Sequence, residues 1–330
     1  MKYRPAAVLL LAAALLSTVG WTGETWGQAK IPRVGILTYQ QGLTGNQAKQ
    51  WYEPFRRTLA NQGWIEGGNV SFEFGNPLGD ASRFAERAAE FVRLKVDVIW
   101  ADSAPGVRAA FAATRTIPIV AIDFTNDPVA TGYADSYGRP GGNVTGVFLD
   151  APEFAGKWLE LLKAVVPGLS RVAILWDPRP GDTHLKAVQA AAPHFGVHIR
   201  VHEVHEPDEI DRAFSAFRGR PQALIILPSP MLYTQSERLA KLLTKHRLPA
   251  TSMAREFADA GGAISYGPER ASAFERSAIL VAKILGGTKP GDLPIERPTK
   301  VQLIVNLKTT KALGLTVPNS VLMRADEVIR

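Results

Sequence analysis

Residues 33–37 read RVGIL, and residues 171–175 read RVAIL. Each run is short and apolar after its arginine, which is typical of a strand buried in the middle of a parallel sheet. The segments that follow the two runs also match in the same order: a second strand, a helix face, a buried third strand, a fourth strand at an apolar-Pro pair, and a Gly-Gly turn before a fifth. Chance explains one such match but not the ordered set, so we predict two lobes of one topology.

The first half of the chain alternates short strands with amphipathic helices. Phe84, Ala88, Phe91 and Val92 share one face of a helix because they follow the i, i+4, i+7, i+8 spacing. The strands that we predict after the first are residues 70–74, 96–100, 117–120 and 144–148. Strands that alternate with helices indicate a parallel sheet covered on both faces. The fold class is therefore α/β, with two similar doubly wound parallel-sheet lobes.

The connecting segments suggest how the lobes are joined. Apolar helix faces lie between the two sets of strands and again after the second set, and a late strand follows at residues 301–305. A helix and a strand left over after the second set indicate that the chain returns to the first lobe and crosses back. We predict a signal peptide over 1–29, lobe 1 over 31–150 plus 268–297, and lobe 2 over 151–267 plus 298–330. Three crossings would make a multi-strand hinge.

The N-terminus and the composition limit the compartment and the partners. Lys2 and Arg4 precede an apolar run over residues 6–16, as in a secretory signal peptide, so we expect a periplasmic or other extracytoplasmic protein. The chain has no cysteine, which excludes disulfides, thiolate nucleophiles and lipidation of an N-terminal cysteine. The net charge is +7, but no Lys/Arg run stands out. We therefore expect no nucleic-acid partner.

Several patterns that could indicate catalysis or metal binding have simpler explanations. His198 and His202 alternate with apolar residues along a strand that has one wet face, and the local order His202-Glu203-Val204-His205 is not a zinc-binding helix motif. The chain contains no phosphate-binding glycine loop, and no acid–base pair stands out near the ends of the strands. We expect no metal, no cofactor and no catalytic residues.

Ligands of open α/β sheets bind beyond the carboxyl ends of the strands. Ser103 is the sharpest candidate because it precedes a helix that begins near Pro105 and Gly106, where free N–H groups would stabilise a carboxylate; alternatively it only caps that helix. Arg255 could pair with an anionic ligand or with a neighbouring acid. The candidate ligand-binding residues from all these loops are Tyr39, Gln40, Ser103, Asn126, Asp177, Ser229, Arg255 and Tyr266.

Other candidates also have two interpretations. Tyr39 could stack against a flat ligand or close the core at a strand end. Asn126 lies in an Asn-Asp-Pro sequence that forms turns well. Tyr266 could contact a ligand or pack as a hinge aromatic. These alternatives stay open on the sequence alone.

The order of the motifs resembles the ABC transporter substrate-binding protein family of the type I periplasmic binding protein fold, whose relatives include aromatic amino-acid binders. The resemblance covers nearly the whole chain after residue 30, and its motifs are residues 31–37, 95–99, 117–120, 126–129, 139–146 and 304–310. It implies an extracytoplasmic receptor that takes up a small molecule, with an ABC permease and its ATPase as partners and no catalysis. We expect a monomer.

One departure from the family bears on the substrate. The amino-acid-binding relatives place acidic residues just after the third and fourth strands of the second lobe, where this chain has Pro-Ser-Pro at 228–230 and Ser-Met-Ala at 252–254. The missing carboxylates argue against an α-amino-acid ligand, so the sequence predicts a small polar or carboxylate-bearing organic solute. The alternatives are a ligand-sensing module for a membrane receptor and an enzyme that uses the cleft.

Overall fold

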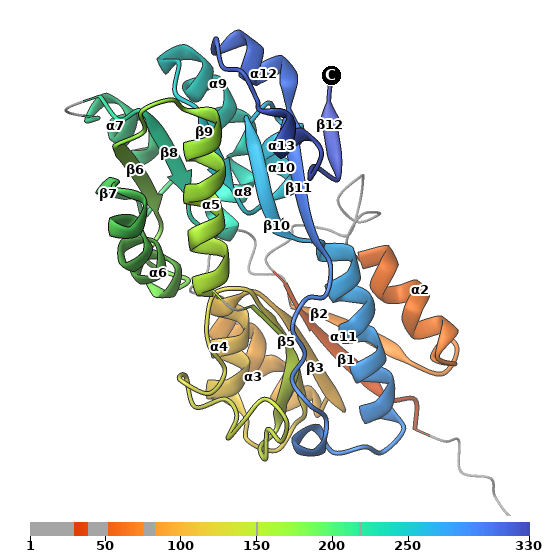
Figure 1. Cartoon of the computed structure of the whole chain (residues 1–330). Coiled ribbons are helices and arrows are strands. Elements are labelled where there is room, and N and C mark those ends of the chain that lie inside the picture. Colours follow the sequence, from red (N-terminus) through yellow and green to blue (C-terminus); the bar gives the residue numbers. More distant parts are fainter. Residues whose placement is uncertain (1–29, 39–51, 76–82, 150, 218–219) are drawn as a thin grey trace, which may run out of the picture. The chain divides into compact units, whose positions relative to one another are not determined.

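The computed structural model describes residues 30–38, 52–75, 83–149, 151–217 and 220–330 (Figure 1). The proposed signal peptide and two candidate site residues, Tyr39 and Gln40, lie outside the described residues.

The first sheet is entirely parallel, with strand order β2-β1-β3-β4-β5. Its strands are β1 (Arg33–Leu37), β2 (Ser71–Gly75), β3 (Val98–Asp102), β4 (Ile119–Asp123) and β5 (Val144–Phe148). Strands β3, β4 and β5 are buried at every position, which explains their mostly apolar character in the sequence.

The second sheet has the order β12-β11-β10-β9-β8-β6-β7. Its strands are β6 (Arg171–Trp176), β7 (His198–Glu203), β8 (Ala223–Ile226), β9 (Ala250–Ser252), β10 (Ile264–Pro268), β11 (Val301–Asn306) and β12 (Glu327–Ile329). The order β7-β6-β8-β9-β10 repeats the topology of the first sheet, which confirms the predicted pair of α/β lobes. One pairing is not parallel: β11 runs antiparallel to β10.

Helices cover both faces of the first sheet (Figure 1). They are α2 (Glu53–Asn61), α3 (Phe84–Leu94), α4 (Ala104–Ala113) and the distant α11 (Arg270–Leu285), which packs against α2 and against β3, β4 and β5. On that face the Trp100 ring lies 5.0 Å from Phe55 and 5.3 Å from Phe274, and its indole N–H donates to Ser277 at 2.8 Å. Burying aromatic side chains of this size stabilises the lobe by about 2–3 kcal/mol each.

The second sheet has its own helices. They are α5 (Ala151–Val165), α6 (Thr183–Ala191), α7 (Glu209–Ser215), α8 (Pro230–Thr234), α9 (Ser236–His246), α10 (Arg255–Asp259), α12 (Leu307–Ala312) and α13 (Asn319–Leu322), with the short 3-10 turn η3 (Ala192–Phe195). A second 3-10 turn, η4 (Pro290–Asp292), contacts β5 of the first sheet. Helix α5 packs against α6, β9 and β10. Its Trp158 is fully buried and donates its indole N–H to the Tyr266 carbonyl at 2.8 Å.

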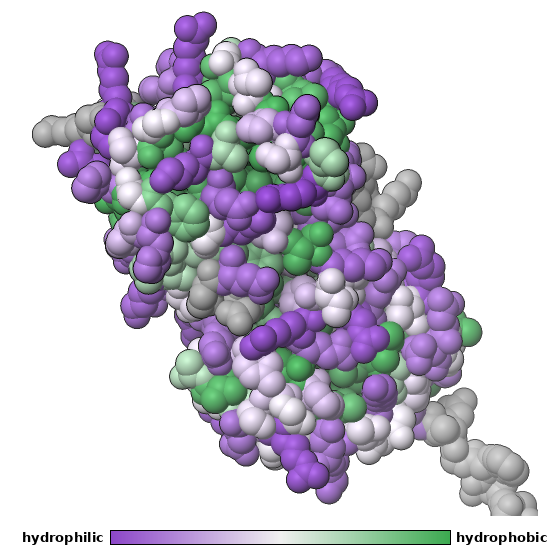
Figure 2. All heavy atoms as spheres, in the orientation of Figure 1, coloured by the Kyte–Doolittle hydropathy of each residue, from purple (hydrophilic) through white to green (hydrophobic). Residues whose placement is uncertain are grey.

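The chain passes between the two sheets three times: from β5 to α5, from β10 to α11, and from Glu296 to β11. Glu296 still pairs with Val147 of the first sheet, while Val301 already pairs with Pro268 of the second. Because β11 enters the second sheet on its return from the first, it runs against β10. On the face drawn in Figure 2, hydrophilic side chains predominate and hydrophobic ones form scattered patches.

Candidate functional site

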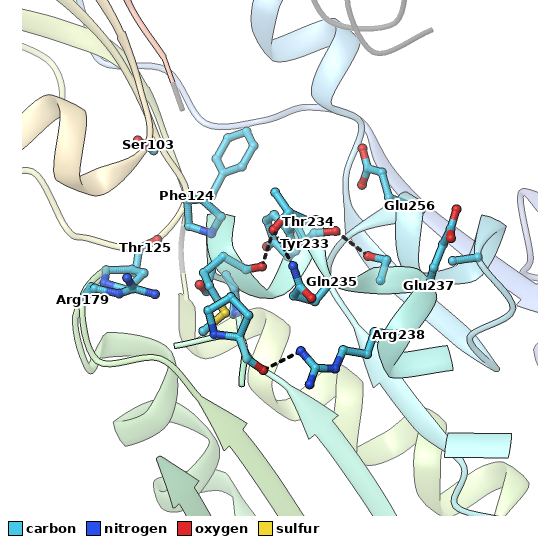
Figure 3. A pocket seen from close by; sticks show the side chains of 18 of the residues that line it. Ser103, Phe124, Thr125, Arg179, Tyr233, Thr234, Gln235, Glu237, Arg238 and Glu256 are labelled. Carbon is cyan, nitrogen blue, oxygen red and sulfur yellow. Dashed lines mark hydrogen bonds between the residues drawn. The ribbon is translucent and has the colours of Figure 1, made fainter. Parts of the chain in front are cut away.

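A cavity of about 1320 Å³ lies at the carboxyl ends of strands from both sheets (Figure 3). Residues after β3 and β4 line it from the first lobe, and residues after β6, β7 and β8 line it from the second. This is the place that open α/β sheets favour for ligands. Its inner lining includes Asp102, Ser103, Phe124, Thr125, Arg179, Ser229, Tyr233, Glu256 and Arg270.

Ser103 lies on the first-lobe wall in a strained backbone conformation. Its φ of 100° and ψ of 147° fall in a region that side-chain-bearing residues rarely adopt, at a cost of about 1–3 kcal/mol. It occupies the position before α4, yet its side chain makes no capping hydrogen bond. Within the part of the chain that the structure describes, its buried hydroxyl oxygen has no hydrogen-bond partner. A strained residue with an unused polar group at a cavity wall is typical of a binding site.

The neighbouring wall after β4 is held by Asp123, which is completely buried. Its carboxylate accepts the Thr125 N–H at 2.8 Å, the Asn126 N–H at 3.2 Å and the Asn126 side-chain amide at 2.8 Å. Burial raises the pKa of Asp123 to about 6, although these donors act in the opposite direction. Asn126 thus lies behind the wall, where it fixes the loop, and it lines neither of the two cavities described here.

One side chain of the second lobe also holds this wall. His184, at the start of α6, lies with its Nε2 2.6 Å from the carbonyl oxygen of Phe124, so the ring donates to that carbonyl. Burial lowers the pKa of His184 to about 4. The imidazole is therefore neutral at ordinary pH, which suits a single N–H donor to a carbonyl. Phe124, which belongs to the first lobe, is thereby also held by a hydrogen bond from the second lobe.

The second-lobe wall contains a serine in a quite different state. Ser229 precedes α8 with an ordinary extended φ of −157°, and its hydroxyl oxygen accepts the Leu232 N–H at 3.3 Å. The same hydroxyl donates to the Asp177 carboxylate at 2.6 Å. Asp177 is 2 % exposed and also accepts from the Arg179 guanidinium at 2.8 and 3.0 Å. Ser229 and Asp177 are therefore hydrogen-bonded to each other, and Arg179, which neutralises the charge of Asp177, lines the cavity.

A smaller cavity of about 300 Å³ adjoins the first. Phe124, Tyr233, Glu256 and Arg270 line both cavities, so these side chains form the partition between them. Arg270 pairs with the buried Asp102 at 3.2 Å. Burial raises the pKa of Asp102, and the Arg270 charge acts against that rise. Burial likewise raises the pKa of the Tyr233 hydroxyl, which stays protonated and can donate a hydrogen bond.

Besides Asn126 and Asp177, two further candidates from the sequence do not line the larger cavity. Arg255 lines only the smaller cavity, and its guanidinium pairs with Asp259 at 3.2 Å and with Glu327 at 2.8 Å. Tyr266, in β10, lines neither cavity; its ring centroid lies 5.5 Å from that of Phe154 in α5, next to a crossing between the lobes. Of the described candidates, the structure brings Ser103 and Ser229 to the larger cavity.

The sequence reasoning missed Phe124, Tyr233 and Arg270. Tyr233 lies four residues after Ser229, so one turn of α8 carries it to the same wall, and this spacing was a usable signal. Phe124 lies two residues before the candidate Asn126. Arg270 gave no comparable signal, because it reaches the site only through the return of the chain to the first lobe.

Neither a metal site nor a membrane-spanning helix is found among the described residues. Among them, no group of three or more His, Asp or Glu side chains is arranged to hold a metal ion. No helix in these parts of the chain has the length and apolar character needed to cross a membrane.

Comparisons with known proteins agree with the fold. A tyrosine-binding protein of Clostridioides difficile (strain R20291) is 26% identical over 308 residues, which cover 90% of this chain and 86% of the relative. A domain from Streptococcus pneumonia, solved in complex with L-Trp, superposes with a TM-score of 0.82 at 22% identity, covering 90% of this chain and 99% of that one.

A conserved domain protein from Vibrio cholerae superposes with a TM-score of 0.83 at 23% identity, covering 91% of this chain and all of that one. These structures share the two-lobed periplasmic binding protein fold. The model of a family described as ABC transporter substrate binding protein matches residues 40–329, nearly the whole described chain. The protein thus belongs to the ABC transporter substrate-binding protein family.

Proposed function

We propose that this substrate-binding protein captures an amino acid, foremost one with an aromatic side chain, and delivers it to an ABC importer. The partners would be a membrane permease and its ATPase, and the protein would act as an extracytoplasmic monomer. The tyrosine-binding relative and the L-Trp complex of the structural neighbour support the amino-acid class. We also propose that the protein binds its solute without transforming it.

The observation that carries the proposal is the unpaired Ser103 hydroxyl in the wall of a cavity built from both lobes. Ser103 also stands before α4, whose first N–H groups lack partners within the helix. Together they would accommodate the carboxylate of an amino acid. An ordinary hydrophilic surface serine would instead be solvated or paired.

The size of the cavity supports a closing motion. Small-molecule sites usually enclose about 300–1,000 Å³, and this cavity of about 1320 Å³ exceeds that range. An amino acid would fill only part of it. Rotation of the lobes about the three crossing segments would narrow the gap, so that affinity depends on contacts with both walls at once. The importer would then recognise the closed form.

A thermal-shift screen tests the proposal. The purified protein is heated with L-tyrosine, L-tryptophan and other amino acids, and in parallel with non-amino carboxylates, sugars and nucleosides. A ligand at about 100 times its dissociation constant should stabilise the protein by about 2.7 kcal/mol, which raises the melting temperature by several degrees. A rise with sugars or nucleosides and with no amino acid would contradict the proposed ligand class.

A further inference from the structure

The two lobes touch at a place where no chain segment connects them. The loop after β4 belongs to the first lobe, and the segment before α6 belongs to the second. The Nε2 atom of His184 lies 2.6 Å from the Phe124 carbonyl oxygen. Close by, a Cβ atom added to Gly181 would lie 3.1 Å from the side-chain oxygen of Asn126. The contact between the lobes therefore involves several residues, and the His184 hydrogen bond is its shortest polar interaction.

His184 is held firmly by its own lobe. The side chain is 2 % exposed and lies at the start of α6. Its ring centroid is 5.6 Å from that of Trp158 in α5, and the Trp158 indole N–H donates to the Tyr266 carbonyl in β10 at 2.8 Å. Helix α5 and strand β10 are the elements of the second lobe that adjoin two of the three crossings. The imidazole thus packs on the part of the second lobe that is next to the hinge.

The polarity of His184 serves the other lobe. Its Nδ1 atom is buried and has no hydrogen-bond partner within the described parts of the chain, whereas Nε2 donates to the Phe124 carbonyl. Burying a polar ring costs free energy unless hydrogen bonds compensate for the lost water. Within the second lobe alone, an apolar side chain of similar size would pack at least as well. The imidazole is therefore explained by its contact with the first lobe.

The carbonyl that accepts this hydrogen bond belongs to a residue of the ligand site. Phe124 lines both cavities and is part of the partition between them. The carboxylate of the preceding residue, Asp123, accepts the N–H groups of Thr125 and Asn126, so the first lobe fixes the main chain on both sides of Phe124. His184 itself lines neither of these cavities. It therefore acts on a ligand only through Phe124.

We infer that His184 is a positioning residue of the ligand site: its N–H holds the Phe124 main chain, and with it the partition, in one place relative to the second lobe. The Asp123 carbonyl accepts the Leu149 N–H at 3.3 Å, so this loop lies beside the crossing from β5 to α5, where rotation of the lobes displaces atoms least. The hydrogen bond therefore persists as the lobes close and adds a non-covalent connection to the three crossings. The inference rests on the proposed function only in requiring a ligand in the larger cavity.

Two substitutions separate the hydrogen bond of His184 from its packing. His184→Gln keeps an N–H donor at about the position of Nε2, and His184→Met fills a similar volume without a donor. Isothermal titration calorimetry with L-tyrosine and L-tryptophan measures affinity. We expect His184→Met to bind about fivefold more weakly than the wild-type protein, because the wall that contains Phe124 is less well fixed. His184→Gln should stay within about twofold of the wild-type affinity.

Hydrogen–deuterium exchange of the protein without ligand measures the same effect at its source. The N–H groups of Thr125 and Asn126 are hydrogen-bonded to Asp123, so their exchange reports opening of the loop. They should exchange at least about fivefold faster in His184→Met and within about twofold of the wild-type rate in His184→Gln. A role confined to the core of the second lobe would instead raise exchange in α5 and α6 and leave residues 124–126 unchanged.

His194→Met is the matched control, because His194 is an exposed histidine of the same lobe outside both cavities. It should leave affinity and exchange within about twofold of the wild-type values. If His184→Met does not fold, His184→Asn takes its place, since its shorter side chain carries an N–H that does not reach the Phe124 carbonyl. The prediction for that variant is the same as for His184→Met.

The outcomes separate this inference from the proposed function. Unchanged exchange at residues 124–126 in His184→Met overturns the inference, and so do equal losses in His184→Met and His184→Gln, which would assign the effect to packing. A wild-type protein that binds neither probe contradicts the amino-acid proposal. In that case the exchange measurement, which needs no ligand, still decides whether His184 holds the wall.

Discussion

Two serines occupy equivalent places in the two lobes and are in opposite states. Ser103 follows the third strand of the first sheet, and Ser229 follows the third strand of the second sheet; each precedes a helix. The Ser229 hydroxyl donates to Asp177 and accepts from Leu232, in relaxed backbone. The Ser103 hydroxyl has no partner in the described structure, and its φ is 100°. The serine hydroxyl of the second-lobe wall thus has both of its hydrogen bonds within the protein, whereas the serine hydroxyl of the first-lobe wall is available to a ligand.

The carboxylates behind the two walls differ in the same way. Asp177 lies in contact with the Arg179 guanidinium at 2.8 Å. Asp123, behind the first-lobe wall, is surrounded mainly by neutral donors of residues 125–126, and burial raises its pKa to about 6. The first-lobe wall therefore includes a carboxyl group that stays protonated into the mildly acidic range.

The largest effect that we expect concerns this carboxyl group. Its pKa rises from 3.8 in the unfolded chain to about 6 in the folded protein, so between these values the folded protein holds a proton that the unfolded chain has released. The contribution of this proton to the free energy of unfolding is therefore lost as the pH rises through this window, and the loss reaches about 3 kcal/mol. Asp123→Asn removes that loss. Urea unfolding at pH 4 and pH 7 should show the difference in stability, pH 7 minus pH 4, more positive in the variant.

His184 makes this measurement more informative, because its contribution to the free energy of unfolding changes with pH in the opposite direction. Its pKa falls from 6.5 to about 4 on folding, so the unfolded chain binds the extra proton and stability is lost as the pH falls from 6.5 to 4. In the wild-type protein the two contributions oppose each other over this range. In Asp123→Asn the contribution of His184 is no longer opposed, so the variant should lose stability more steeply than the wild-type protein as the pH falls from 6.5 to 4. An unchanged pH dependence in the variant would contradict the environment described for Asp123.

The second effect concerns the satisfied serine. Ser229→Ala removes the donor to the buried Asp177 carboxylate and the acceptor for the Leu232 N–H. We expect a loss of about 2 kcal/mol in the free energy of unfolding, measured by urea denaturation at pH 7, because both an N-cap and a hydrogen bond to a charged group disappear. A loss below about 0.5 kcal/mol would mean that the two serines do not differ as the structure indicates.

The third effect concerns the unpaired serine. Ser103→Ala should weaken a ligand identified in the thermal-shift screen by about tenfold, or 1.4 kcal/mol, because the site loses a hydrogen-bond partner for the ligand. The unfolding free energy without ligand should change by less than about 0.5 kcal/mol, since no internal hydrogen bond is lost. Calorimetry and urea denaturation of one preparation measure both quantities. Full ligand affinity in this variant would remove Ser103 from the site.

The contrast between the serines shows what the sequence could and could not predict. The ordered repeat predicted two α/β lobes, and the rule about strand ends led to both serines. The sequence placed Ser103 first among the candidates, but it did not predict that the two hydroxyl groups differ in their partners, because each serine follows a buried strand and stands close to a proline, Pro105 or Pro230. Their difference depends on Asp177, whose carboxylate reaches Ser229 across 52 residues of chain. Such long-range pairing depends on the packed structure rather than on local pattern.

Long-range pairing also determines which charged side chains are available to a ligand. Arg255 and Glu256 are adjacent in the sequence and equally suited to a ligand. The position of Glu327, far along the chain in β12, determines that Arg255 is paired internally. Tyr266 was likewise a plausible contact until its packing against Phe154 was known. The topology was therefore predictable from periodicity, whereas the assignment of individual side chains required the partners that the fold brings together.

The smallest effect tests the backbone difference between the serines directly. Ser103→Gly removes the side chain that makes φ 100° costly, and the relief of about 1–3 kcal/mol outweighs the entropy that glycine loses on folding, about 0.5–1 kcal/mol. We expect a net gain of about 1 kcal/mol in the unfolding free energy without ligand. Ser229→Gly is the matched control: at a φ of −157° there is no strain to relieve, so this substitution should destabilise the protein. If both glycine variants lose stability, Ser103 is not strained, and its unpaired hydroxyl would be the only feature that sets the first-lobe wall apart.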